Sequence, residues 1–301
     1  MNTCTPIVLF TYKRIDPLKK TILYLRKNSL AKESVLYIYS DGPKNNEEES
    51  EISNVRDFLK TIEGFKSVII QESKENKGLA ISIIQGVTEV LNKHDSVIVL
   101  EDDLYTQPNF LSYMNASLDR YRDEKQVLSV CGFSFDLNVE HIDYDAYFLN
   151  RPWPWGWAIW KDRWVEIDWD VKNYESFKSN RNKRKAFSKL GSDVNSMLDK
   201  QMAGQLDSWA IRWTYHQFCN EMISVFPKHS LVFNGGFDEF ATHTKGSSKR
   251  YIPVLDKSGK TNFQLPRHIM IDRKVQSSFL KKMSIKSRII SKFQTLYEKY
   301  T

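Results

Sequence analysis

Residues 96–114 read SVIVLEDDLYTQPNFLSYM, and this stretch decides the fold. Its apolar, β-branched run at 97–100 predicts a buried strand, and Pro108 then opens an amphipathic helix. Between the two stand three consecutive carboxylates, Glu101, Asp102 and Asp103. Such acids repel one another, and a nearby cation would relieve this repulsion. An isolated acidic triplet is more often a solvated turn than a binding site, so the surrounding sequence decides its meaning.

The same alternation of strand and helix extends along the first half of the chain. Strands are expected at 5–12, 34–42, 65–73, 95–103 and 126–135, and helices at 15–28, 45–64, 78–94 and 108–124. Strands separated by helices of this length indicate a parallel α/β sheet. In such sheets ligands bind beyond the carboxyl ends of the strands. The acidic triplet lies at that edge.

Other polar residues follow the neighbouring strands. Arg14 follows the first strand, and the sequence SDGP at 40–43 ends the second. Asp41 at that position suits hydrogen bonding to a nucleoside, although Asp-Gly is equally typical of a simple turn. The sequence NKGLA at 76–80 precedes a helix, where Gly78 allows close approach of a ligand to the backbone and Lys77 could meet a phosphate.

After about residue 145 the pattern changes to an aromatic and helical one. Five Trp residues fall within 153–164, and a last strand pair is expected at 223–234. Indole rings suit sugar faces, but core packing accounts for Trp clusters equally well. We expect a single composite domain over 1–272, with a nucleotide-binding half at about 1–135 and a catalytic half at about 136–272. A basic tail, 273–301, follows.

The charge distribution argues against a nucleic-acid-binding protein. Eight of the 44 Lys and Arg residues and one of the 37 acids lie in 273–301, so the other 272 residues carry 36 of each and are neutral. Nucleic-acid binding would place the basic groups on the folded body. The N-terminus lacks a signal-peptide pattern, and no apolar run is long enough to span a membrane. We therefore expect a cytoplasmic protein.

Together, IVLFTYKR, SDGP, NKGLAISIIQGV and VIVLEDDLYTQPNFLSYM resemble the nucleotide-binding half of GT-A glycosyltransferases. The likeness is to the N-acetylglucosaminyltransferase I-like group and to bacterial surface-polysaccharide glycosyltransferases. The resemblance implies a GT-A fold in which Asp103 binds Mn²⁺ (or Mg²⁺) that bridges the donor diphosphate, while Asp102 lies near the ribose or sugar. Residues assigned to the donor are Thr11, Arg14, Asp41, Lys77, Gly78, Glu101 and Asp102.

The second half resembles the group more loosely. WPWGWAIW at 153–160 is similar to the turn that lines the donor and acceptor site, which assigns Trp155, Gly156 and Trp157 to sugar stacking. In QLDSWAIRW, Asp207 is the nearest match to the catalytic base, although Ser208 replaces the second acid of the usual pair and Asp207 could simply cap a helix. His243, in FATHT, is similar to a late histidine near the metal.

These assignments predict an inverting, metal-dependent transferase moving a sugar from a UDP-linked donor, such as UDP-GlcNAc or UDP-Gal, to a hydroxyl of a glycan or lipid-linked glycan in capsule or O-antigen assembly. The basic, amphipathic pattern of 273–301 predicts peripheral contact with an anionic membrane on its inner face, or else a helix docked on the body.

Two alternatives to the transferase function remain: a nucleotidyltransferase that makes the sugar nucleotide, and a carbohydrate-binding protein without catalytic activity.

Overall fold

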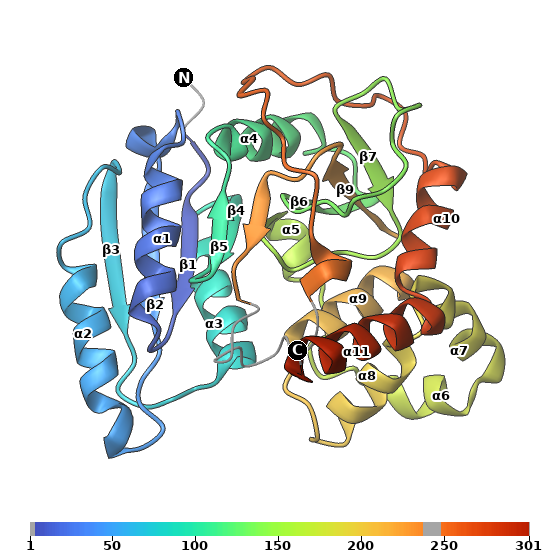
Figure 1. Cartoon of the computed structure of the whole chain (residues 1–301), viewed down its shortest axis with the longest axis horizontal. Coiled ribbons are helices and arrows are strands. Elements are labelled where there is room, and N and C mark those ends of the chain that lie inside the picture. Colours follow the sequence, from blue (N-terminus) through green and yellow to red (C-terminus); the bar gives the residue numbers. More distant parts are fainter. Residues whose placement is uncertain (1–3, 237–247, 301) are drawn as a thin grey trace.

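The protein is a mixed α/β structure built on one large sheet with helices on both faces (Figure 1). The computed structural model describes residues 4–236 and 248–300. The strands of the large sheet are β1 (Ile7–Thr11), β2 (Val35–Ser40), β3 (Ser67–Glu72), β4 (Ser96–Glu101), β6 (Val127–Cys131), β7 (Ala146–Leu149), β8 (Trp157–Trp160) and β9 (Ile223–Pro227). Two short strands, β5 (Leu104–Thr106) and β10 (Val232–Asn234), pair antiparallel in a separate sheet.

The order of strands in the large sheet is β3-β2-β1-β4-β8-β6-β9-β7. All strands run in one direction except β8 and β7, which run opposite to their neighbours. The predicted α/β fold with a mostly parallel sheet is therefore confirmed. β8 lies between β4 and β6, so the sheet continues without a break from the first half of the chain into the second.

Helices cover both faces of the sheet. The helices of the described residues are α1 (Ile15–Arg26), α2 (Glu49–Leu59), α3 (Leu79–Leu91), α4 (Phe110–Arg120), α5 (Lys161–Trp164), α6 (Tyr174–Ser179), α7 (Arg181–Phe187), α8 (Val194–Met202), α9 (Trp209–Cys219), α10 (Arg273–Lys282) and α11 (Ile285–Tyr300). Short 3₁₀ helices are η1 (Ala31–Glu33), η2 (Asn46–Glu48), η3 (Ser188–Leu190) and η4 (Ser248–Tyr251). Within the described residues, no helix has the length and apolar character that a membrane span requires.

The two faces of β1 show why the sequence folds this way. Side chains alternate along a strand, so Ile7 and Leu9 enter the core beneath α1 and α2, while Val8 and Phe10 enter the core beneath α3 and α9. All four are buried. A strand that is apolar at every position is thus explained by helices on both sides.

The order β3-β2-β1-β4 places a topological switch point between β1 and β4. From β1 the chain moves outward to β2 and β3, then crosses back to add β4 on the other side of β1. At such a point the loops after the two central strands diverge and leave a crevice at the carboxyl edge. The segments at this crevice are 12–14, which follows β1, and 101–103, at the end of β4.

The prediction that the two strands within 223–234 pair with each other is wrong. Both strands exist, but β9 lies between β6 and β7 in the large sheet, and β10 pairs with β5. Between them, the backbone N–H of Leu231 donates to Gly132 O at 2.9 Å, and Leu231 O accepts from the Gln107 N–H at 2.8 Å. These bonds direct the chain away from β9. An apolar pattern indicates a strand but does not identify its partner.

Candidate active site

Asp102 and Asp103 share one cation, the guanidinium of Arg14. Arg14 follows β1, and its Nη2 donates to Asp102 Oδ1 and to Asp103 Oδ2, each at 2.7 Å. Asp102 Oδ2 also accepts from Thr11 Oγ1 at 3.2 Å and from the backbone N–H of Tyr12 at 3.3 Å. These groups meet because β1 and β4 are adjacent and parallel. The acidic triplet therefore has a counter-charge within its own chain.

The environment of this cluster is only partly open to solvent. The side chains of Arg14 and Asp103 are 22% and 16% exposed, whereas that of Asp102 is 7% exposed. Burial and the charge of Asp103 raise the pKa of Asp102 to about 6, although Arg14 acts in the opposite direction. Burial and the charges of Asp103 and Asp102 raise the pKa of Glu101 to about 8. The positive charge of Arg14 thus only partly offsets the repulsion among the three acids.

One donor of Arg14 is left over. Its Nη1 is buried and has no hydrogen-bond partner among the described residues. Buried donors are normally satisfied, so an orphaned one at a crevice needs an explanation. A guanidinium recognises phosphate and carboxylate oxygens particularly well. Nη1 is enclosed in this conformation, so an anionic ligand would contact it only after the Arg14 side chain moves.

The second sheet brings a glycine pair to Asp103, which the sequence analysis missed. β10 pairs with β5 so that Asn234 lies opposite Leu104, and the Gly235 N–H then donates to Asp103 O at 2.8 Å. A Cβ added to Gly236 would lie 2.1 Å from Asp103 Oδ2. A side chain at Gly236 would therefore have to displace the Asp103 carboxylate. The one available signal was the sequence NGG directly after a predicted strand.

Asp41 organises the loop before α3. Its Oδ1 accepts from the backbone N–H groups of Gly42 and Lys77, each at 2.9 Å, and its Oδ2 accepts from the Gly78 N–H at 3.0 Å and from Asn76 Nδ2 at 3.2 Å. Gly78 has a φ of +76°, in the left-handed region that favours glycine. The assignment of Asp41 to the nucleoside stays a prediction, because both of its oxygens are engaged within the protein. The Lys77 side chain is exposed and its Nζ donates to Gln85 at 3.0 Å.

These two clusters are neighbours, and Asp207 lies beside the second. The Asp41 N–H donates to Thr11 O at 3.1 Å, which links the loop after β2 to the end of β1. Asp207 is exposed, and its Oδ2 lies 3.4 Å from the position that a Cβ on Gly78 would take. The alternative reading of Asp207 as a helix cap is wrong, because Ser208 caps α9 by accepting from the Ile211 N–H at 3.3 Å. Asp207 thus carries an exposed carboxylate beside Gly78, and this carboxylate does not cap α9.

The Trp cluster mainly builds the core. Trp157 is 1% exposed, and its ring lies 4.8–5.8 Å, centroid to centroid, from those of Trp164, Trp209 and Trp213. The expectation that Trp157 stacks on a sugar is therefore wrong for this conformation, because no ring face is open. A strand in a central position of a sheet has both faces covered, and β8 is such a strand.

Trp155 and Gly156 also have structural contacts. Trp155 is half-buried and packs edge-on against Phe133 at 4.7 Å and Tyr251 at 5.3 Å between ring centroids. Gly156 has a φ of +64°, and a Cβ there would lie 2.8 Å from Val232. Close packing between β8 and β10 therefore accounts for this glycine. Sugar stacking by Trp155 stays a prediction.

Asp103 could be one ligand of a divalent cation, but the described residues around it do not complete a metal site. Its carboxylate is the oxygen ligand that Mn²⁺ or Mg²⁺ prefers. No cluster of three or more His, Cys, Asp or Glu side chains with metal-binding geometry occurs within 4–236 and 248–300. His243 lies outside the described residues. A metal at Asp103 would therefore need most of its oxygens from a bound ligand such as a diphosphate.

Glu48, which the sequence analysis did not single out, fixes the segment after β1. It accepts from the Tyr12 hydroxyl, from Lys13 Nζ at 3.1 Å and from the Lys44 N–H at 2.9 Å. The hydrogen bond from Tyr12 is the main reason why the pKa of Glu48 falls to about 2. In the sequence Glu48 lies within an acidic run that is typical of a solvated helix start, so no signal distinguished it.

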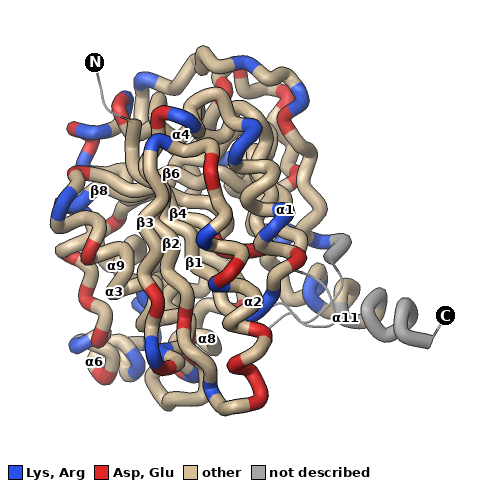
Figure 2. Tube along the Cα trace, turned by 90° about the vertical axis from the view of Figure 1, so that its left-hand side faces the viewer, with Lys and Arg blue, Asp and Glu red and all other residues tan. Residues whose placement is uncertain are grey.

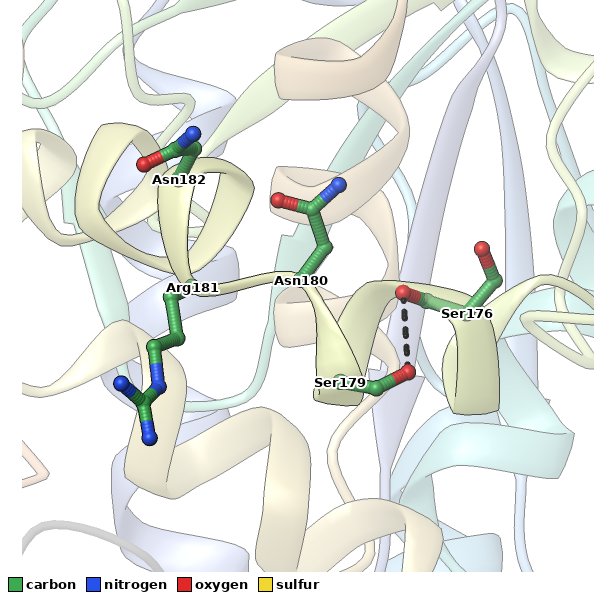
Figure 3. Close-up of a pocket in the computed structure, with 5 residues that line it drawn as sticks. All are labelled: Ser176, Ser179, Asn180, Arg181 and Asn182. Atoms are coloured by element: carbon green, nitrogen blue, oxygen red, sulfur yellow. Dashed lines mark hydrogen bonds between the residues drawn. The ribbon is translucent and has the colours of Figure 1, made fainter.

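A separate hollow lies in the helical region, away from these clusters. Figure 3 shows it between α6 and α7, lined by Ser176, Ser179, Asn180, Arg181 and Asn182. Its volume is about 610 Å³. Ser179 Oγ donates to Ser176 O at 3.4 Å, so part of its polar lining is satisfied internally. None of the predicted site residues lines this hollow, and its position on two short helices gives it no chemistry of its own.

Comparisons with known proteins give only distant likenesses. No family model and no curated protein matches the chain. Among solved structures, it is similar to the mannosyltransferase PcManGT from Pyrobaculum calidifontis in complex with GDP-Man and Mn²⁺, at 10% identity and a TM-score of 0.35, over 53% of this chain and 45% of that one. The chain thus spans less than half the length of that mannosyltransferase.

Two further structures are similar at the same level. A UDP-glucose pyrophosphorylase complexed with UDP-glucose has 12% identity and a TM-score of 0.39, over 74% of this chain and 90% of that one. TarS from S. aureus has 12% identity and a TM-score of 0.29, over 43% of this chain and 22% of that one. Likenesses this distant leave the function to be argued from the site.

Proposed function

We propose that the protein is a glycosyltransferase that takes its sugar from a nucleotide donor. The orphaned Nη1 of Arg14, beside Asp102 and Asp103 at a topological switch point, carries this proposal. A nucleoside diphosphate offers phosphate oxygens that could accept a hydrogen bond from the unpaired Nη1. The adjacent loop at 76–78, whose backbone N–H groups at Lys77 and Gly78 donate to Asp41, carries the exposed Lys77 side chain near the same edge.

Asp207 is the proposed general base. It is an exposed carboxylate that lies beside Gly78 and comes from the second half of the chain. A base at this position would accept the proton of an acceptor hydroxyl while the donor diphosphate departs. The charge that develops on the diphosphate lies toward Arg14. An inverting displacement requires the base and the departing diphosphate on opposite sides of the sugar carbon, and we propose this arrangement.

The metal has a limited part in this proposal. Asp103 would hold Mn²⁺ or Mg²⁺, and the cation would neutralise the negative charge of the diphosphate. Arg14 then has to share Asp103 with the metal or release it, since Asp103 Oδ2 is hydrogen-bonded to Arg14 at 2.7 Å.

Donor and acceptor follow from the resemblance described above. We propose a UDP-linked hexose or N-acetylhexosamine, such as UDP-GlcNAc or UDP-Gal, and a glycan or lipid-linked glycan acceptor in capsule or O-antigen assembly in the bacterial cytoplasm. Trp155 is proposed to contact the acceptor, since its ring is half-buried rather than enclosed. His243 is proposed as a second ligand of the metal.

Binding and turnover of nucleotide sugars test the proposal. The wild-type protein is titrated calorimetrically with UDP-GlcNAc, UDP-Gal, UDP-glucose and GDP-mannose, with Mn²⁺ and with a chelator. Asp103→Asn should weaken donor binding, and Asp207→Asn should bind the donor normally but lose donor hydrolysis and transfer. Asp119→Asn, at an exposed ion pair on α4, is the matched control and should do neither. Unchanged donor affinity in Asp103→Asn would refute the site, and full activity in Asp207→Asn would refute the base.

The same assay separates the two alternatives. A nucleotidyltransferase would release pyrophosphate from a nucleoside triphosphate and a sugar phosphate, whereas a transferase releases a nucleoside diphosphate from the sugar nucleotide. Binding of a free glycan without any nucleotide binding would instead indicate a carbohydrate-binding protein.

A further inference from the structure

The basic tail divides into two helices that behave differently. α10 docks on the body: Val275, Phe279 and Met283 are buried, and Asp272 caps the helix by accepting from the Val275 N–H at 2.9 Å. For α10, the structure therefore agrees with the alternative prediction of a helix docked on the body. Any contact with a partner must therefore be sought in α11.

α11 turns its apolar side away from the protein. Ile285 is 64% exposed, Ile289 50%, Ile290 47% and Phe293 69%. At about 100° per residue, Ile285, Ile289 and Phe293 fall within an arc of about 80° around the helix axis. Ile290 extends that arc on one side. The small polar Ser287 and Ser291, on the opposite side, are half-buried. An amphipathic helix normally buries its apolar side, and α11 does the reverse.

The charge around this face favours one occupant. Between residues 273 and 297 the sequence has seven basic residues and no acid: Arg273, Lys274, Lys281, Lys282, Lys286, Arg288 and Lys292. Lys281, Lys286 and Arg288 are exposed at or beside the start of α11. A second copy of this chain would bring like charges together across the contact, which opposes association. An anionic lipid surface offers both apolar volume and opposite charge.

The position of α11 suits such a contact. In Figure 1 strands β1 to β3 point toward the lower end of the molecule, and α11 lies in that same lower half. Figure 2, seen from the side, places α11 at the margin of the molecule rather than over the central sheet. α11 therefore lies in the half of the molecule toward which the strands that carry the candidate site run.

We propose that α11 is an interfacial helix that lies in the headgroup layer of an anionic membrane, with Ile285, Ile289 and Phe293 inserted between the lipids. Lys286 and Arg288 remain in the headgroup layer and contact the lipid phosphates. This proposal does not depend on the proposed catalytic activity.

Vesicle flotation with the full-length protein tests it. The vesicles are phosphatidylcholine alone, or phosphatidylcholine with about a quarter of phosphatidylglycerol. We expect binding to the anionic vesicles only, weakening as salt is raised. The variant Ile289→Asp/Phe293→Asp should lower binding by about tenfold or more, because two apolar contacts are replaced by charges that the membrane repels. Lys286→Gln/Arg288→Gln should also lower it.

A matched control replaces an exposed apolar residue elsewhere. Leu23→Asp on α1, where Leu23 is 53% exposed, should leave vesicle binding unchanged. Because all of these side chains are exposed, the variants should unfold at the wild-type denaturant concentration. Equal binding by Ile289→Asp/Phe293→Asp and wild type would overturn the proposal, and so would equal binding to neutral vesicles or no binding at all. If the same variant abolishes self-association in light scattering but not vesicle binding, the face is a contact between copies instead.

Discussion

Replacing Arg14 by Met should destabilise the protein in a way that depends on pH. The methionine removes the guanidinium that lies between Asp102 and Asp103, and it leaves the hydrocarbon volume largely in place. Two carboxylates, with Glu101 beside them, then remain at the end of β4 without that counter-charge. The variant therefore tests whether Arg14 offsets the repulsion within the acidic triplet.

The magnitude follows from the burial of the partners. Breaking a buried ion pair by removing one partner costs about 3–5 kcal/mol, whereas an exposed pair contributes at most about 1 kcal/mol. Arg14 and Asp103 are 22% and 16% exposed, so solvent screens part of the interaction. We expect a loss of about 2–3 kcal/mol in the free energy of unfolding near neutral pH. For a domain of this size, that loss lowers the melting temperature by about 3–5 °C.

Protonation should recover part of the loss. The folded-state pKa of Asp102 is already raised to about 6 in the presence of Arg14, and it must rise further without it. A carboxyl group with a raised folded-state pKa binds its proton more tightly in the folded state, so stability falls as pH rises from about 4 through that raised pKa. The deficit of the variant should consequently be small at about pH 5 and largest at about pH 8.

Urea unfolding at these two pH values, followed by Trp fluorescence, measures the deficit. Arg122→Met is the control, because Arg122 pairs with Asp119 where both side chains are 63% exposed, and it should change stability by less than about 0.5 kcal/mol. An Arg14→Met variant as stable as the wild type at the higher pH would refute the reasoning. A deficit of equal size at both pH values would also do so, since it would locate the effect in packing rather than in charge.

Three further predictions concern the same region and the core. Glu101→Gln should abolish the fall in stability that Glu101 causes between about pH 4.5 and 8, because the folded-state pKa of Glu101 is raised to about 8. Urea unfolding of the variant and the wild type across this pH range checks this, and identical stability–pH profiles of the two proteins would contradict it. Gly236→Ala should displace Asp103, which lies 2.1 Å from the added Cβ, and weaken nucleotide-sugar binding in calorimetry without unfolding the chain. Trp157→Ala should cost about 3–5 kcal/mol in urea unfolding, and Trp155→Ala distinctly less, because only Trp157 is enclosed.

The sequence was sufficient for the elements of the first half and for the edge at which they end. Apolar runs bounded by helices predicted β1 to β4, and the rule for parallel sheets placed Arg14, Asp41 and Asp103 at one edge. The direct contact between Arg14 and Asp103 was not predictable, because spacing along the chain does not determine which side chains meet across adjacent strands. Their hydrogen bond joins residues separated by 89 positions.

In the second half, the sequence signals were ambiguous for a physical reason. A Trp that stacks on a sugar and a Trp that fills the core look the same in a sequence. The role of Trp157 could therefore not be assigned before its neighbours were known. The approach of Gly236 to Asp103 depends on the pairing of β10 with β5, two strands of three residues each. Strands this short carry almost no periodic pattern.

The position of β8 has a consequence for how the chain assembles as it is synthesised. When the ribosome has made the first 135 residues, β4 and β6 are both present, but the strand that joins them, Trp157–Trp160, is not. Each then has an unpaired edge of backbone N–H and C=O groups, and exposed edges of apolar strands invite pairing with other chains. Closure of the sheet also waits for β9, near residue 223. The nascent chain thus exposes the edges of two apolar strands until the residues of β8 have been made, and such exposed edges favour aggregation.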